Sequence, residues 1–207
     1  MAQTSPDASD DRPPRAPFLA VAFAASAAFC AISLSGGSVA KYRWSAIFLV
    51  PIVWAIFLLR RRLALRPLHF ALLAVGLLAH DMGAFGWYQR KPLGLQYDWY
   101  VHFFFGVVGG LVVARTLEQR LALRGAPRAL LSVLVIVGLG AVHEIIEAAS
   151  TARLGPEYGM LIVGADDPYD TQEDMFNNLL GASLAQLLHG RRRTDGLDAP
   201  SDRGRRS

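Results

Sequence analysis

The sequence predicts an all-α, polytopic transmembrane bundle of about six helices, and two observations lead to this prediction. Hydrophobic residues make up 53% of the 207-residue chain, whereas charged residues make up only 18%. The charges also lie in short runs between apolar stretches of roughly 20 residues, the length that crosses the hydrocarbon core of a bilayer.

Six segments have this character: residues 17–35, 44–60, 67–87, 98–117, 129–149 and 171–189. Pro67 falls in the first turn of the third segment, where a missing N–H costs nothing. Gly125 and Pro127 mark a break before the fifth segment. We therefore expect one transmembrane domain, residues 17–189, between two disordered polar tails, residues 1–16 and 190–207. The acidic residues before residue 17 favour a retained helix over a cleaved signal peptide.

Basic residues predict the orientation. With both tails in the cytoplasm, the inner segments hold 16 Arg and Lys residues and the outer segments hold 5. Such an asymmetry is typical of cytoplasmic loops, so we expect a multi-pass protein of the inner (plasma) membrane with both termini cytoplasmic. This topology explains the net charge of +4 without a nucleic-acid partner, leaving the lipid bilayer as the expected partner. Cys30 is the only cysteine, which excludes an intrachain disulfide.

Polar residues of four predicted helices, most of them ionisable, gather at the outer face of the membrane. In chain order they are His80 and Asp81; Asp98 and His102; His143, Glu144 and Glu147; and Asp170, Asp174, Asn177 and Asn178. Charged groups within membrane spans are costly and normally face an interior site. Spacings of three or four residues put the members of the fourth, fifth and sixth predicted helices on a shared face of each helix. Small residues, Gly106 and Gly181, continue two of these faces and permit close helix approach.

We expect one shared interior space, open to the outside, whose candidate catalytic or ligand-binding residues are Asp98, His102, Glu144, Glu147 and Asp174. These residues and Asp170 are also candidate ligands of a divalent metal ion. Their carboxylates cannot all ionise close together without compensation. Oxygen and imidazole ligands suit Mn, Zn or Mg.

Structural interpretations remain open for the same residues. Asp98 and Asp170 are suitable helix N-caps, and His102 is equally suited to a structural hydrogen bond. Glu144 and Glu147 lie near a C-terminal helix end, where the helix dipole disfavours negative charge. Basic side chains of the outer loops would neutralise them in a purely structural cluster: Arg90, Lys91 and Arg153.

Three motifs together resemble the YjdF-type family of bacterial inner-membrane proteins, whose function is unknown. They are Asp98–Phe103, Glu144–Glu147 and Asp170–Asp174 with Asn178 and Gly181. A more distant resemblance is to VanZ-like proteins, which are associated with glycopeptide-antibiotic resistance. Trp99 and Glu147 depart from that pattern, which usually has Lys and Gln there, and this argues against teicoplanin-type resistance.

Three functions are compatible with these features. The first is an outward-facing site, acidic and His-containing, that acts on an envelope or lipid-linked polar group. The second is a structural or assembly role in which the polar residues lock helix ends together. The third is a small transporter, which the apolar inner halves of the spans disfavour.

Overall fold

The computed structural model describes residues 15–35, 40–155, 158–159 and 169–197. These residues form six α-helices joined by turns and short 3₁₀ helices, with no strand among them. The α-helices are α1 (Arg15–Leu34), α2 (Ala40–Leu59), α3 (Pro67–Asp81), α4 (Tyr97–Leu121), α5 (Gly125–Leu154) and α6 (Asp170–Leu197). The 3₁₀ helices are η1 (Met82–Phe85), η2 (Trp87–Gln89) and η3 (Pro92–Gly94). The predicted helical bundle is confirmed.

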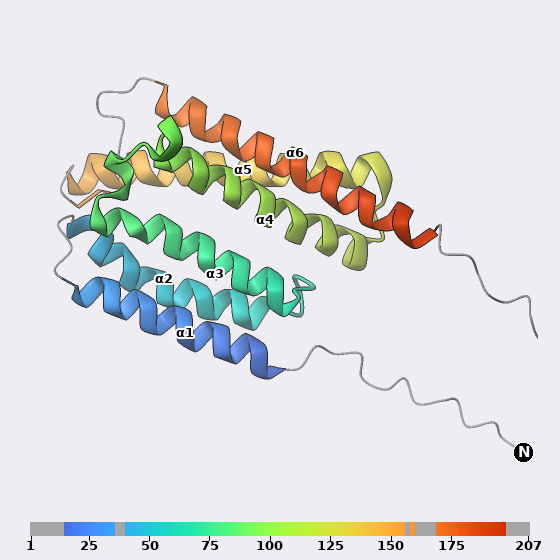
Figure 1. Ribbon diagram of the computed structural model, residues 1–207, viewed down its shortest axis with the longest axis horizontal. Coiled ribbons are helices and arrows are strands. Elements are labelled where there is room, and N and C mark those ends of the chain that lie inside the picture. Colours follow the sequence, from blue (N-terminus) through green and yellow to red (C-terminus); the bar gives the residue numbers. More distant parts are fainter. Residues whose placement is uncertain (1–14, 36–39, 156–157, 160–168, 198–207) are drawn as a thin grey trace, which may run out of the picture.

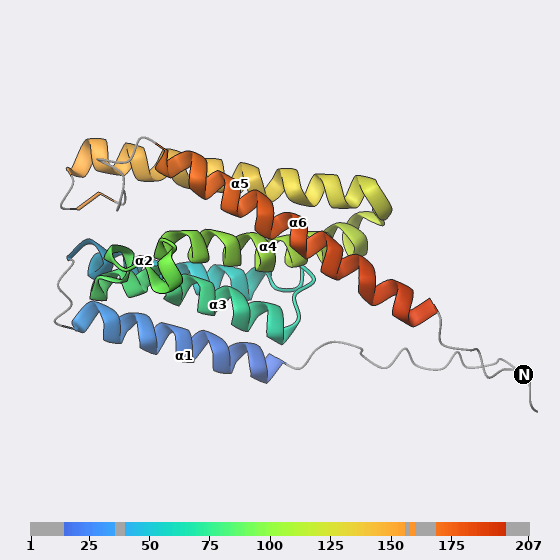
Figure 2. The same cartoon turned by 45° about the horizontal axis from the view of Figure 1, so that its top comes forward.

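The helices lie roughly side by side, with α1, α2 and α3 in one half of the bundle and α4, α5 and α6 in the other (Figure 1). The two views agree that α3 ends, α4 begins, α5 ends and α6 begins at one end (Figures 1 and 2). We call this the site end. The opposite end holds the α2–α3 and α4–α5 connections, the start of α1 and the end of α6, and we call it the basic end.

Large aromatic side chains fill the half built from α1, α2 and α3. Phe18, Phe29 and Phe70 are almost completely buried. The rings of Phe18 and Phe70 lie 5.7 Å apart between centroids, and Phe57 packs 6.5 Å from Phe70. Two of these three phenylalanines belong to α1, so α1 contributes to the core of this half.

Small residues fill the contact between α4 and α6, the most extensive helix pair in the bundle. A Cβ atom added to Gly106 would lie 2.6 Å from the Asn178 carbonyl oxygen. One added to Gly181 would collide with the Phe103 carbonyl oxygen. The two backbones therefore touch, as the sequence spacing predicts, and the polar side chains beside this crossing are held close together.

Four segments in the described part of the chain are long and apolar enough to cross a membrane: Arg15–Leu34, Pro67–Phe85, Tyr97–Leu121 and Gly125–Leu154. The apolar part of α2, Arg43–Leu59, is shorter. α6 has a polar first half but runs alongside α4 and α5 between the two ends of the bundle (Figure 2). Exposed Phe, Leu and Ile side chains cover much of the helix surfaces, as contact with lipid requires.

Several helix boundaries differ from the sequence expectation. The predicted third helix is α-helical only to Asp81, continues as the 3₁₀ helix η1 to Phe85, and ends at Gly86, whose φ is 73°. The predicted fifth helix begins at Gly125, because Pro127 fits the first turn of a helix. The tail predicted from residue 190 is wrong up to Leu197, since Gly190 alone does not stop α6. Residues 1–14 and 198–207 lie outside the described residues.

Candidate functional site

Three predicted ligands meet where α4 and α6 cross at the site end. His102 Nε2 lies 3.4 Å from Asp98 Oδ1, one turn earlier on α4. The same nitrogen lies 3.4 Å from Asp174 Oδ2 on α6. Each of the three side chains offers one ligand atom, and these atoms all lie within 4.8 Å of one another. One imidazole and two carboxylates thus face a common point.

Asn178 contacts the other nitrogen of this histidine. The Asn178 Nδ2 atom lies 3.1 Å from His102 Nδ1, and Asn178 is completely buried. If the amide donates this bond, the His102 proton resides on Nε2 and faces both carboxylates. If the amide turns over, Asn178 Oδ1 accepts a proton from Nδ1 and leaves Nε2 free to bind a cation. Either orientation keeps the ring fixed.

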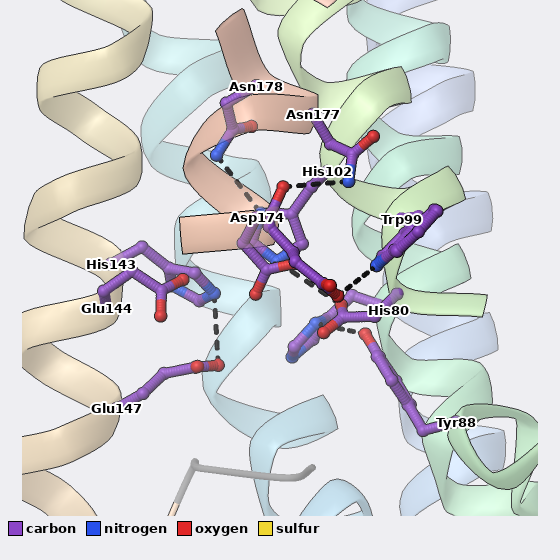
Figure 3. Close-up of polar contacts among 12 residues, drawn as sticks. His80, Tyr88, Trp99, His102, His143, Glu144, Glu147, Asp174, Asn177 and Asn178 are labelled. Atoms are coloured by element: carbon purple, nitrogen blue, oxygen red, sulfur yellow. Dashed lines mark hydrogen bonds and ion pairs between the residues drawn. The ribbon is translucent and has the colours of Figure 1, made fainter. Parts of the chain in front are cut away.

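α5 adds a second imidazole–carboxylate pair and a further glutamate. His143 Nε2 lies 3.2 Å from Glu147 Oε1, and the His143 side chain is 35% exposed whereas that of Glu147 is 8% exposed. Thr171 Oγ1 donates to Glu144 Oε2 over 3.0 Å, which ties α5 to the first turn of α6. The predicted residues of α5 are thus turned towards those of α4 and α6 (Figure 3).

Imidazole rings connect these groups. The centroid of His143 lies 5.9 Å from that of His102 and 6.0 Å from that of His80. His80 in turn lies 2.9 Å from the Tyr88 hydroxyl. We refer to the central six residues as the polar cluster: Asp98, His102, His143, Glu144, Glu147 and Asp174. Of the five residues predicted from the sequence, Asp98, His102 and Asp174 form a compact group, and Glu144 and Glu147 lie close enough to interact electrostatically with Asp174.

The polar cluster gathers four carboxyl groups, and the partners of three of them are the imidazoles of His102 and His143. The carboxyl group of Asp174 interacts electrostatically with those of Asp98, Asp170, Glu144 and Glu147. No described Arg or Lys forms an ion pair with Asp98, Asp174 or the two glutamates. The basic residues expected to neutralise them lie elsewhere: Lys91 and Arg153 are exposed, and Arg90 lies over the Trp87 ring, 5.0 Å from its centroid.

Three oxygen atoms of the site are buried without a hydrogen-bond partner among the described residues. They are Asp174 Oδ1, Glu144 Oε1 and Asn178 Oδ1. Asp174 is only 2% exposed. Buried polar atoms normally have partners, because an unpaired one costs about 1–3 kcal/mol. Spare acceptors in one place are therefore a feature that a bound cation would explain.

Other predicted residues occupy different positions. Asp98 does not cap its helix, because α4 begins at Tyr97 after the N-cap Gln96. Asp170 is the first residue of α6 and is half-buried. Asp81 is buried at the end of α3 but accepts a hydrogen bond from Ser45 of α2 over 2.8 Å, so it lies apart from the polar cluster.

Sequence analysis assigned no role to the groups that hold the site in place. Thr171, which contacts Glu144, and Tyr88, which contacts His80, are examples. Trp99 Nε1 donates to Glu173 Oε2 over 2.9 Å, a link between residues 74 positions apart. Helix periodicity carries no signal for such contacts, because it orders residues on one helix and not the neighbours across helices.

The bundle and its polar cluster define a polytopic helical membrane protein with a buried group of acidic and histidine side chains at one end of the bundle. The chain belongs to the family described as "Predicted membrane protein (DUF2238)", whose model matches residues 17–195. It is 30% identical over 143 residues to "Inner membrane protein YjdF" of Escherichia coli (strain K12). This match covers 63% of the present chain and 68% of that relative. No solved structure matches it significantly. The predicted YjdF-type resemblance is confirmed.

Proposed function

We propose that this protein binds a divalent cation in its polar cluster and uses it to act on a polar group of an envelope or lipid-linked molecule. The name of the Escherichia coli relative supports the inner membrane as its location. The basic-residue asymmetry supports an orientation with both termini in the cytoplasm and the site end outside.

One observation carries the metal proposal. Asp98, His102 and Asp174 offer three ligand atoms within 4.8 Å of one another, in a buried place where no described Arg or Lys is paired with either aspartate. Hard divalent ions take carboxylate oxygens, and Zn and Mn also accept imidazole. Asn178 would then orient His102 from the second coordination shell. Asp170, Glu144 and Glu147 contribute further negative charge near Asp174.

The chemistry proposed for the site uses the second pair. His143 is the more exposed member of its pair with Glu147, so it can contact a group arriving from the open side. A carboxylate that is hydrogen-bonded to an imidazole stabilises the imidazolium that forms when the ring accepts a proton. Such a pair is therefore suited to act as a general base. A cation held by Asp98, His102 and Asp174 would supply Lewis-acid activation of a phosphoryl or carbonyl oxygen. His143 would take the proton of the attacking hydroxyl and pass it to the departing group, whose bond to the phosphorus or carbonyl carbon breaks.

A thermal-shift series in detergent tests the metal proposal. Wild-type protein should melt at higher temperature with Mn, Zn or Mg and at lower temperature with chelator. A ligand at a hundredfold excess over its Kd stabilises by about 2.7 kcal/mol. Glu144→Gln keeps the side-chain shape and removes one charge, so it should fold while responding much less. If no ion and no chelator shifts the wild type, the metal proposal is wrong.

Incubation with a total envelope lipid extract tests the proposed activity. Wild-type protein with metal should convert at least one extract component, detected by mass spectrometry. Glu147 is paired with His143 and, unlike Glu144, has no buried oxygen without a partner among the described residues, so Glu147→Gln should fold and still bind metal. It should convert at least tenfold less, because His143 loses its carboxylate. If metal-loaded wild-type protein leaves the extract unchanged, the proposed activity is wrong. The proposed metal binding is tested separately by the thermal-shift series.

Cysteine labelling in intact cells tests the orientation. Cys30 is exposed and the only cysteine, so it is first replaced by Ala. A cysteine at Arg153 should then react with a membrane-impermeant reagent, and one at Arg120 should not. Both positions are exposed and lie at opposite ends of the bundle. Labelling of position 120 would reverse the proposed topology.

A purely structural role is the competing proposal, supported by two contacts. Thr171 links Glu144 to α6, and Asn178 links His102 to α6. Both tie helix ends together. In this case Glu144→Gln would melt far below wild type, and metal would have no effect on either protein.

A further inference from the structure

A second feature of the site end lies on a different face of α6. Seven residues line a groove of about 560 Å³, which we call the aromatic groove: Trp99, Tyr169, Gln172, Glu173, Phe176, Asn177 and Leu180. Five of them lie on one face of α6, related by spacings of three or four residues, and Tyr169 directly precedes the helix, so they form one stripe. The residues of α6 in the polar cluster and its support, Asp174 and Asn178, do not line this groove.

Three of the lining residues are aromatic, and one is a carboxylate. Trp99, Tyr169 and Phe176 supply the rings. Glu173 is held in place by the Trp99 indole N–H, 2.9 Å from its Oε2, and Asn177 donates to the Glu173 backbone carbonyl. No described Arg or Lys forms an ion pair with Glu173. Aromatic faces with a carboxylate are the combination that attracts an ammonium group.

The polarity of the groove also changes along its length. Glu173 and Gln172 lie near the start of α6, whereas Leu180 lies about 10 Å further along the helix at 1.5 Å per residue. Phe176 is 58% exposed and Leu180 is 43% exposed, facing the surroundings of the bundle. A polar end near the membrane surface and an apolar end towards the hydrocarbon match an amphiphile lying along the helix.

We propose that the aromatic groove binds an amine-bearing lipid of the phosphatidylethanolamine type, with its ammonium group at Glu173 and the aromatic rings and its acyl chain along Leu180. The volume falls within the range of small-molecule sites. The binding uses residues outside the polar cluster, so it does not depend on the proposed metal. An anionic lipid is disfavoured because Glu173 would repel its head group.

Native mass spectrometry of the full chain in detergent tests this proposal. Phosphatidylethanolamine and phosphatidylglycerol with identical acyl chains are added in equal amounts, and retained lipid is counted. Wild type should retain the amine lipid about tenfold better, the scale of one cation–π contact and one charged contact. Glu173→Gln should reduce this preference to about twofold, and Glu173→Lys should reverse it. Free ethanolamine should not displace the lipid, because it has no acyl chain.

Matched controls separate the groove from the rest of α6. Leu179→Ala changes an exposed residue of the same helix that does not line the groove, so the preference should persist. Phe176→Ala should weaken retention of the amine lipid. Asp174→Asn should retain the preference even if it loses metal binding. Where Glu173→Gln does not fold, Trp99→Phe removes the N–H that positions Glu173 and should lower the preference. Equal retention of both lipids by wild type, or an unchanged preference in the folded Glu173 variants, would overturn the proposal.

Discussion

The two ends of the bundle differ in how completely their polar side chains are hydrogen-bonded. At the basic end, Arg115 Nε donates to the Ala64 carbonyl over 2.8 Å, and Thr116 Oγ1 donates to the Leu63 carbonyl over 2.7 Å. Arg120 likewise reaches the carbonyls of Arg61 and Arg62. These contacts satisfy the α2–α3 turn, which contains Ala64 at a φ of 49°. The polar side chains there stabilise the turn between α2 and α3.

At the site end, the buried polar groups exceed the partners that the described residues supply. Asp174 and Glu144 each keep one buried oxygen without a hydrogen bond. At the basic end, by contrast, the carboxylate of Glu118 has a partner, because its Oε2 lies 2.8 Å from His189 Nε2. Proteins retain such uncompensated groups at a cost in stability, and they do so most often at functional sites. The buried oxygen of Gln186, further along α6, also has no hydrogen-bond partner among the described residues, but it belongs to a neutral amide. The grouping of carboxyl oxygens is what supports a ligand at the site end.

Close packing of α4 on α6 supports the site end, and disrupting it should have the largest effect. Gly181→Ala places a Cβ against the Phe103 carbonyl, so we expect a loss of about 3 kcal/mol in the free energy of unfolding and a loss of metal response. Gly138→Ala is the matched control, because its Cβ would meet nothing within 4 Å. Denaturant or thermal unfolding of both variants measures the difference. Equal stability of the two would show that the helix crossing does not hold the site.

Removing a carboxylate should have different consequences at the two ends. Asp174→Asn should abolish the stabilisation of about 2.7 kcal/mol that a hundredfold excess of metal provides. Glu118→Gln weakens the contact with His189 and should lower stability without changing the response to metal. Melting curves of both variants with and without ion measure this contrast. A metal response that survives in Asp174→Asn would remove Asp174 from the ligands.

The second-shell amide should have a smaller effect. Asn178→Leu keeps the approximate volume but cannot orient His102, so metal affinity should fall about 10–100-fold. Asn178→Asp, which retains an acceptor for His102 Nδ1–H, should recover part of that affinity. Titration of each variant with Mn or Zn provides the values. Wild-type affinity in Asn178→Leu would mean that Asn178 only packs against α4.

The smallest effect is expected at the basic end. Thr116→Val is nearly isosteric and removes the hydroxyl that bonds to Leu63 and Val112. We expect a loss of about 1 kcal/mol in the free energy of unfolding. The affinity for metal should stay at the wild-type value, since the change lies far from the polar cluster along α4. A weaker metal affinity in this variant would show that the two ends are coupled.

Much of this contrast could be predicted from the sequence. Apolar stretches placed the helices, and i, i+4 spacing placed Asp98 and His102 on one face. Gly106 and Gly181 predicted the close approach of α4 and α6, which the structure contains. These signals are local, because helix periodicity and residue size are properties of single segments.

Contacts between helices could not be predicted in the same way. The position of Asp81 against Ser45 depends on how α3 packs on α2. The pairing of Thr171 with Glu144 depends on the relative rotation of α5 and α6. The continuation of α6 to Leu197 also exceeded the apolar pattern, because the basic residues after Gly190 are good helix formers.

Direct analysis of bound metal is the most decisive test of the central proposal, that the polar cluster is a cation site. Purified wild-type protein is equilibrated with Mn or Zn, freed of unbound ion and examined by elemental analysis and X-ray absorption spectroscopy. We expect one ion per chain, with oxygen ligands and at least one imidazole, and less than a tenth of that amount in the folded Asp98→Asn and Asp174→Asn variants. A wild-type protein that retains neither ion, or retains it equally in both variants, would contradict the proposal.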